Sequence, residues 1–170
     1  IKDKNPSSPL TESDLFDVTD DELQAAGTTG ERVSEIMQQL GEAKGWLIRL
    51  ETGEKCLAPS LVLNKVAYYT TFTPASGGGG GDDPCYVGEG IARVYALQYQ
   101  TGNAAFNFDL TNDDGTTKVI SKTDRSKGIG TGMPSGVVMT FIGGKGILFI
   151  GVGGGVNKID PNVKQREPKY

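Results

Sequence analysis

The sequence predicts a mainly β fold that follows a short helical N-terminal segment. From Gly45 onward the apolar residues change from a helical period to alternation, and β-branched and aromatic residues become frequent. Glycine accounts for 25 of 170 residues, about twice its usual share of ~7%, and the absence of a Gly-X-Y period excludes collagen. We therefore expect residues 1–44 to form an arm and two short helices, residues 45–157 the β region, and residues 158–170 a basic tail.

Two capping boxes mark the expected helices. Thr19 with Glu22, and Thr28 with Glu31, have the spacing at which a hydroxyl and a carboxylate satisfy backbone N–H groups at a helix start. They predict helices near 20–26 and 30–41, after an extended arm over 1–14. The second helix has one apolar stripe and a glycine, Gly41, expected to end it. The stripe consists of Val33, Ile36, Met37 and Leu40.

The β region divides into hairpins separated by a long loop. The loop over 74–90 contains five successive glycines, which cannot hold one conformation cheaply. Two prolines, Pro59 and Pro134, each precede a serine and an apolar strand, 75 residues apart, and this weak repeat suggests propeller blades. The expected strands are 46–50, 60–63, 66–72, 92–99 with its partner 105–109, 136–142 and 147–152.

These strands supply only part of a β-propeller. One full blade and parts of two others cannot close a ring, so we expect the chain to expose sheet edges and to associate. Either it is a fragment of a longer chain or it docks on other chains. The first residue is Ile1, which likewise suggests a processed chain or a fragment.

Composition excludes several classes of function. The formal net charge of −4 gives no general attraction to nucleic acid or to anionic membranes. The sequence has no histidine, which removes Ser-His-Asp and Cys-His catalytic arrangements and every His metal ligand. No apolar stretch is long enough for a transmembrane helix. We therefore expect a non-enzymatic protein that requires no cofactor.

The two cysteines, Cys56 and Cys85, belong to no CxxC motif. They form either one disulfide or two buried thiols. The disulfide is the favoured interpretation because Cys85 lies in an Asp-Asp-Pro-Cys turn beside the glycine run, and a disulfide implies an oxidising compartment.

A resemblance first becomes specific within residues 96–106. This segment resembles the tryptophan-docking repeat of quinoprotein-type propellers, Ala-x-Asp-x-x-Thr-Gly-Lys-x-x-Trp. The resemblance implies that the Thr-Gly turn sets a hairpin and that the terminal aromatic residue docks between blades. Ala96, Thr101 and Gly102 match the repeat, whereas Gln98, Asn103 and Phe106 replace its Asp, Lys and Trp. These departures argue against a working quinone site.

A wider ordered pattern resembles the C-terminal propeller region of the PilY family of type IV pilus assembly and pilus-tip adhesin proteins. The pattern covers about residues 13–156 and consists of segments 14–21, 45–50, 53–74, 83–85, 92–109 and 130–136. The resemblance implies a partial propeller of PilY type in a secreted, cell-surface protein of pilus biogenesis or adhesion. Its implied partners are pilins, minor pilins or the rest of a longer PilY-like chain.

Some PilY members bind Ca²⁺ in an EF-like loop, and the nearest candidate begins at Leu110. With Gly115 at loop position six, Leu110 and Ser121 occupy positions one and twelve, so the loop fails as an EF-hand. Four oxygen-bearing residues, Asp109, Asn112, Asp113 and Asp114, form either an irregular Ca²⁺ site or an ordinary Asn/Asp/Gly turn. The alternative function is therefore a Ca²⁺- or glycan-binding module for surface attachment, which uses this turn and the 74–90 loop.

Overall fold

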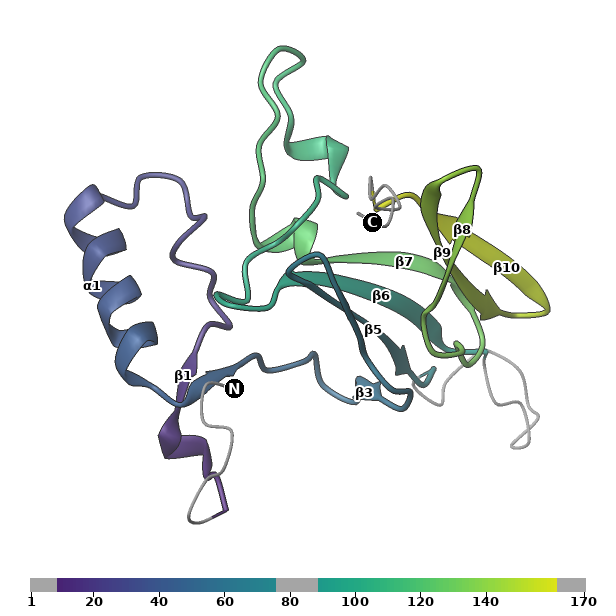
Figure 1. Ribbon diagram of the computed structural model, residues 1–170, viewed down its shortest axis with the longest axis horizontal. Helices are drawn as coiled ribbons and strands as arrows, with labels where there is room; N and C mark the ends of the chain where they lie inside the picture. Colours follow the sequence, from purple (N-terminus) through teal and green to yellow (C-terminus); the bar gives the residue numbers. More distant parts are fainter. Residues whose placement is uncertain (1–8, 76–88, 162–170) are drawn as a thin grey trace, which may run out of the picture. The chain divides into compact units, whose positions relative to one another are not determined.

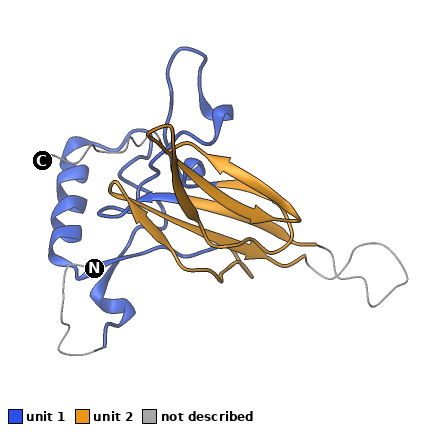
Figure 2. Ribbon diagram, turned by 45° about the vertical axis from the view of Figure 1, so that its right-hand side comes forward, with its two compact units in different colours: residues 1–50, 96–126 blue, residues 51–95, 127–170 orange. Residues whose placement is uncertain are grey.

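The computed structural model describes residues 9–75 and 89–161. The chain forms two compact units, each built from two stretches of sequence (Figure 2). Unit 1 comprises residues 1–50 and 96–126, and unit 2 comprises residues 51–95 and 127–170. The fold is mainly β, as the sequence predicts, and no sheet formed by the described residues closes on itself.

Unit 1 contains the long helix α1 (Gly30–Glu42) and a two-stranded parallel sheet. The sheet pairs β1 (Leu15–Asp17) with β2 (Gly45–Leu47) (Figure 1). Strand β1 follows the expected arm over 1–14, at a place where the sequence predicted no strand, and β2 is shorter than the strand expected over 46–50. Three short 3-10 helices complete the described part of this unit. They are η1 (Glu12–Asp14), η2 (Leu110–Asn112) and η3 (Lys122–Arg125).

Helix α1 confirms the predicted amphipathic helix. Its N-cap is Thr29, one residue after the expected position, and the Thr29 side chain accepts a hydrogen bond from the Arg32 backbone N–H. Ile36 and Leu40 are buried in a small core with Val18. The helix passes through Gly41, so the predicted stop is wrong by about one residue.

The helix expected near 20–26 is absent; this segment forms turns. Asp21 has a φ of 55°, in the left-handed region that interrupts an α-helix. The Thr19 hydroxyl accepts a hydrogen bond from the Arg49 backbone N–H instead of capping a helix. The capping-box pattern therefore failed here because its hydroxyl has a partner 30 residues away.

Unit 2 is built around a five-stranded sheet in the order β3-β5-β6-β7, with β4 also paired to β5. The turn between β4 and β5 contains Asn64 and Lys65, both with positive φ, as a two-residue type I′ hairpin requires. This hairpin is the one predicted from the sequence. The strands are β3 (Lys55–Cys56), β4 (Leu61–Leu63), β5 (Val66–Thr73), β6 (Ile91–Gln98, whose last residues belong to unit 1) and β7 (Ser126–Thr131).

A second sheet of unit 2 is an antiparallel meander in the order β10-β9-β8. It consists of β8 (Val138–Ile142), β9 (Lys145–Val152) and β10 (Gly155–Ile159). The sequence predicted the β8–β9 hairpin and missed β10. Gly–Gly pairs with positive φ form both turns: Gly143 and Gly144, then Gly153 and Gly154.

One face of this meander, its inner face, is buried along β9, whereas Phe141 on β8 remains 38% exposed there. Leu148, Ile150 and Val152 point to it and are at most 8% exposed. Strand β7 lies against it: the Asn157 side chain donates to the Ile129 carbonyl at 2.9 Å. The two sheets of unit 2 therefore share a core beneath β9.

The strand expected over 105–109 does not form. Ala104 makes an isolated bridge with Leu97 at the end of β6, and the chain then leaves the sheet. The Asp109 backbone N–H donates to a carboxylate oxygen of Asp124 at 2.7 Å, and Asp124 is fully buried. The Asp109 N–H, which would pair with a neighbouring strand if 105–109 were in the sheet, therefore bonds the buried Asp124 carboxylate instead.

Candidate functional site

The outer face of the β8–β9–β10 meander is apolar although it is largely exposed. Residues that pair in register on neighbouring strands share a face of the sheet. One row across this face consists of Val138, Phe149 and Lys158. The other rows are Thr140 with Ile147, Ile142 with Lys145, and Gly151 with Val156. Val138, Ile142 and Val156 are 63%, 55% and 65% exposed. We call this surface the outer face; it comprises Val138, Thr140, Ile142, Lys145, Ile147, Phe149, Gly151, Val156 and Lys158.

Two lysines flank the outer face, and no strand residue on it carries a negative charge. The Lys158 ammonium lies 5.9 Å from the centre of the Phe149 ring, within the range of a cation–π contact. Lys145 stands at the other end, opposite Ile142. The outer face is therefore an apolar surface with a positive rim.

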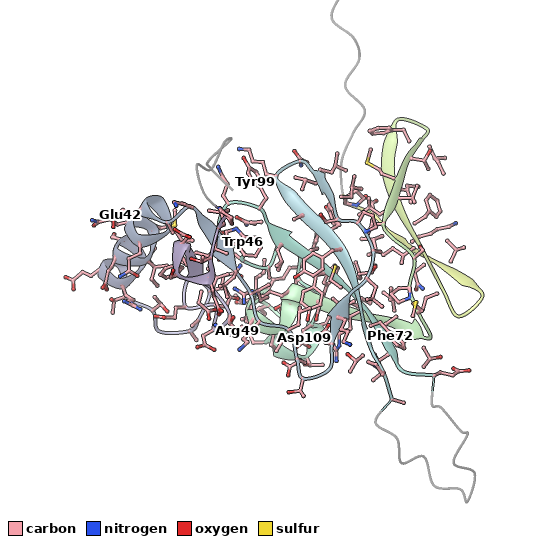
Figure 3. The ribbon with its side chains drawn as sticks, turned by 90° about the horizontal axis from the view of Figure 1, so that it is seen from below. Glu42, Trp46, Arg49, Phe72, Tyr99 and Asp109 are labelled. Atoms are coloured by element: carbon pink, nitrogen blue, oxygen red, sulfur yellow. The ribbon has the colours of Figure 1, made fainter. Side chains whose placement is uncertain are left out.

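Unit 1 contains a pocket between α1 and the turn after β6. Its volume is about 340 Å³. The Trp46 indole N–H donates to the Tyr99 carbonyl oxygen at 2.8 Å, which joins β2 to this turn. Figure 3 labels Trp46 and Tyr99. The lining residues of this aromatic pocket are Met37, Leu40, Gly41, Gly45, Trp46, Tyr99, Gln100 and Thr101.

Two residues of the predicted docking motif shape that turn. The backbone N–H groups of Thr101 and Gly102 both donate to the Gln98 carbonyl, at 3.2 and 2.8 Å. Gly102 has a φ of 72°, and a Cβ there would lie 2.6 Å from a Val18 methyl and 3.2 Å from the Trp46 ring. The predicted Thr-Gly turn is thus present, and Trp46 packs on its glycine.

The other two motif residues lie away from this turn. Ala96 is fully buried within β6. Phe106 stacks on Phe108, with ring centres 5.6 Å apart. The role expected for Phe106, docking between blades, remains a prediction.

A second, polar cavity in unit 1 contains a buried ion pair. It measures about 210 Å³. The Arg125 guanidinium lies 3.1 Å from the Asp21 carboxylate, and both side chains are almost completely buried. Burial raises the pKa of Asp21, which the positive charge of Arg125 opposes. Arg125 also donates to the Thr19 carbonyl, so the pair ties the 18–21 turn to η3.

The predicted Ca²⁺ ligands serve separate local turns. Asp109 accepts from the backbone and hydroxyl of Thr111, whereas Asp114 accepts from the backbone N–H groups of Thr116 and Thr117. These hydrogen bonds lower the pKa of both carboxyl groups.

Asn112 and Asp113 are engaged in different contacts again. Asn112 donates to the buried Asp124 at 3.1 Å, and Asp113 accepts from Asn107 and from the Val119 backbone. Within the described residues, no three His, Cys, Asp or Glu side chains are grouped so that they could hold a metal ion. Each of the four residues thus has hydrogen-bond partners of its own, and Ca²⁺ binding by them remains a prediction.

The predicted disulfide involves a residue outside the described part of the chain. Cys56 is exposed on β3, with its sulfur 3.6 Å from the Ala58 carbonyl oxygen. Cys85 and most of the 74–90 loop lie outside the described residues. The disulfide and a role for this loop therefore remain predictions.

Sequence reasoning did not predict the buried carboxylates of the described residues, which are Asp21, Asp124 and Glu54. Glu54 lies in unit 2. It accepts hydrogen bonds from the Thr71 hydroxyl, from the Tyr95 hydroxyl at 3.1 Å and from the Glu51 backbone N–H at 3.1 Å. Tyr95 stacks on Tyr69, with ring centres 4.9 Å apart. Because donors surround the carboxylate, Glu54 holds the strand ends together. Nothing in the local sequence around Glu54 indicates Thr71 and Tyr95 as its partners, which lie 17 and 41 positions later.

No family model, no curated protein and no solved structure matches the chain. None of the helices in the described part is long and apolar enough to cross a membrane.

Proposed function

We propose that the chain is a non-enzymatic protein-interaction module that docks through its outer face. One observation carries the proposal: β8 and β9 have apolar side chains on both faces, and the described residues cover only one face. Strands buried on both sides are near-continuous apolar runs, and 137–139 and 147–150 are such runs. A contiguous exposed apolar surface of this kind is typical of an interaction site.

The lysines on the outer face specify the chemistry of the partner. Lys145 and Lys158 favour a partner surface with an apolar centre and carboxylates at its edge. Two copies of this chain in contact through the face would bring lysine rims together, which is unfavourable. We therefore propose a different protein surface as the occupant.

We also propose that this module belongs to a partial β-propeller of PilY type in extracellular type IV pilus machinery. The resemblance of the sequence supports this context. Blades of a propeller pack face to face, so each needs apolar side chains on both sides, and the outer face meets that requirement. The partner is then a neighbouring blade in the rest of a longer PilY-like chain, a pilin or a minor pilin.

The test compares three valines of nearly equal exposure. Val138→Lys and Val156→Lys change the outer face; Val62→Lys, on β4, is the matched control because Val62 is 60% exposed. Binding to purified pilin and minor pilins of the same organism is measured by surface plasmon resonance. Full burial of a valine contributes about 1.5–3 kcal/mol. Burying the roughly two-thirds of each side chain that is now exposed would therefore contribute about 1–2 kcal/mol, and its loss corresponds to about a 5- to 30-fold increase in Kd.

The expected result is weaker binding for the two outer-face variants and unchanged binding for Val62→Lys. Equal affinities for all four proteins would reject the outer face as the docking surface. Loss of binding in Val62→Lys alone would assign docking to the β4 edge.

A further inference from the structure

We infer that the aromatic pocket of unit 1 binds a neutral saccharide. Its volume of about 340 Å³ falls in the range of small-molecule sites, which combine apolar walls with a few convergent polar groups. This pocket shares no residue with the outer face. It also differs from the 74–90 loop and the 109–114 turn in which the sequence suggested glycan binding.

The walls of the pocket are held in place before a ligand arrives. The hydrogen bond from the Trp46 indole to the Tyr99 carbonyl fixes one edge of the ring. Gly102 supports the ring from behind, because only a residue without a Cβ leaves room there. Leu40 is 7% exposed and belongs to the core of unit 1. Such preorganisation lowers the entropy cost of binding.

The lining chemistry selects an uncharged ligand. None of the eight lining residues carries a formal charge at neutral pH. A charged ligand would lose hydration without gaining an ion partner, which is unfavourable. The ligand is therefore neutral.

The same lining requires a ligand with one apolar face and several hydroxyl groups. Trp46 and Met37 offer apolar surface, and Met37 is 49% exposed. The Gln100 amide, the Thr101 hydroxyl and the Tyr99 phenol each donate and accept hydrogen bonds. A sugar ring combines a C–H face that packs on an aromatic ring with a circle of hydroxyls. A purely apolar ligand would displace water from the exposed Gln100 amide and Tyr99 phenol without replacing the hydrogen bonds of that water.

Trp46 is the single tryptophan of the chain, so its fluorescence reports on this pocket alone. The full chain is titrated with the methyl glycosides of glucose, galactose and mannose and with N-acetylglucosamine. Two variants, Tyr99→Ala and Gln100→Ala, keep the backbone carbonyl that Trp46 bonds. Gln39→Ala is the control, since Gln39 is exposed on α1 and is not among the lining residues.

The expected result is a saturable change in Trp46 emission with at least one sugar. The affinity for that sugar should be at least tenfold lower in Tyr99→Ala and Gln100→Ala and unchanged in Gln39→Ala. Tyr99→Phe guards against a folding defect, because it keeps the wall and removes one hydroxyl; it should weaken binding several-fold. No saturable response to any sugar overturns the inference, as does equal affinity in all variants. A response to neutral 3-phenylpropionamide without one to sugars would instead assign the pocket to apolar side chains.

Discussion

Replacing Gly102 by alanine tests how the turn after β6 is held against Trp46. An L-residue at φ of 72° costs about 1–2 kcal/mol on its own. The new Cβ would lie 2.6 Å from a methyl of the buried Val18 and 3.2 Å from Trp46, and such overpacking costs about 1–3 kcal/mol more. We therefore expect Gly102→Ala to destabilise unit 1 by about 2–5 kcal/mol.

A second glycine separates the two contributions. Gly27 has a φ of 86°, and a Cβ there would meet nothing within 4 Å, so Gly27→Ala carries only the backbone cost. Urea unfolding followed by Trp46 fluorescence compares the two variants with the parent chain. With m near 1–3 kcal/mol/M, the Gly102→Ala midpoint should lie about 1 M below that of Gly27→Ala. Equal midpoints would refute the contact between this turn and Trp46.

Three further predictions concern the carboxylates of unit 1. Asparagine can adopt the same backbone conformation as Asp21, but Asp21→Asn leaves the buried Arg125 without its charge partner. The free energy of unfolding, measured in urea, should therefore fall by about 3 kcal/mol. The pKa of Asp14 is lowered to about 2, first by the Thr11 backbone N–H and then by Lys44. The stability that this carboxylate contributes above pH 4 should therefore be lost as the pH falls through 2. The melting temperature of Asp14→Asn should consequently fall less steeply with decreasing pH than that of the parent chain. Calorimetry with Ca²⁺ should release no heat, since Asp113 and Asp114 already accept separate hydrogen bonds; a saturable heat that Asp113→Ala abolishes would contradict this.

Local patterns in the sequence predicted the elements that form from local contacts. Helix α1 has Ile36 and Leu40 on one face, and that face is the buried one. The turns at Asn64–Lys65 and Gly143–Gly144 have positive φ, and both hairpins around them were predicted. In each case the residues that determine the structure are within a few positions of one another.

Elements that depend on distant residues could not be predicted in this way. A turn replaces the helix expected near 20–26 because the Thr19 hydroxyl bonds the Arg49 backbone, 30 positions later, and the Asp21 carboxylate pairs with Arg125, 104 positions later. The parallel pairing of β1 with β2 joins Phe16 to Trp46, and no turn signal marks it. The aromatic pocket likewise joins Trp46 to Tyr99, 53 positions apart. Nothing in the local sequence of either residue indicates the other.

The meander that carries the outer face needs no partner in order to form. Both of its turns are two-residue Gly–Gly hairpins, which fix the register of β8, β9 and β10. Its inner face is buried in unit 2 along β9, and a slip of one residue would expose Leu148 and Ile150. The outer face is therefore presented as a rigid surface, and docking should proceed without coupled folding. It follows that the valine variants should act mainly on the dissociation rate, whereas Lys145 and Lys158 should act on the association rate and its dependence on salt.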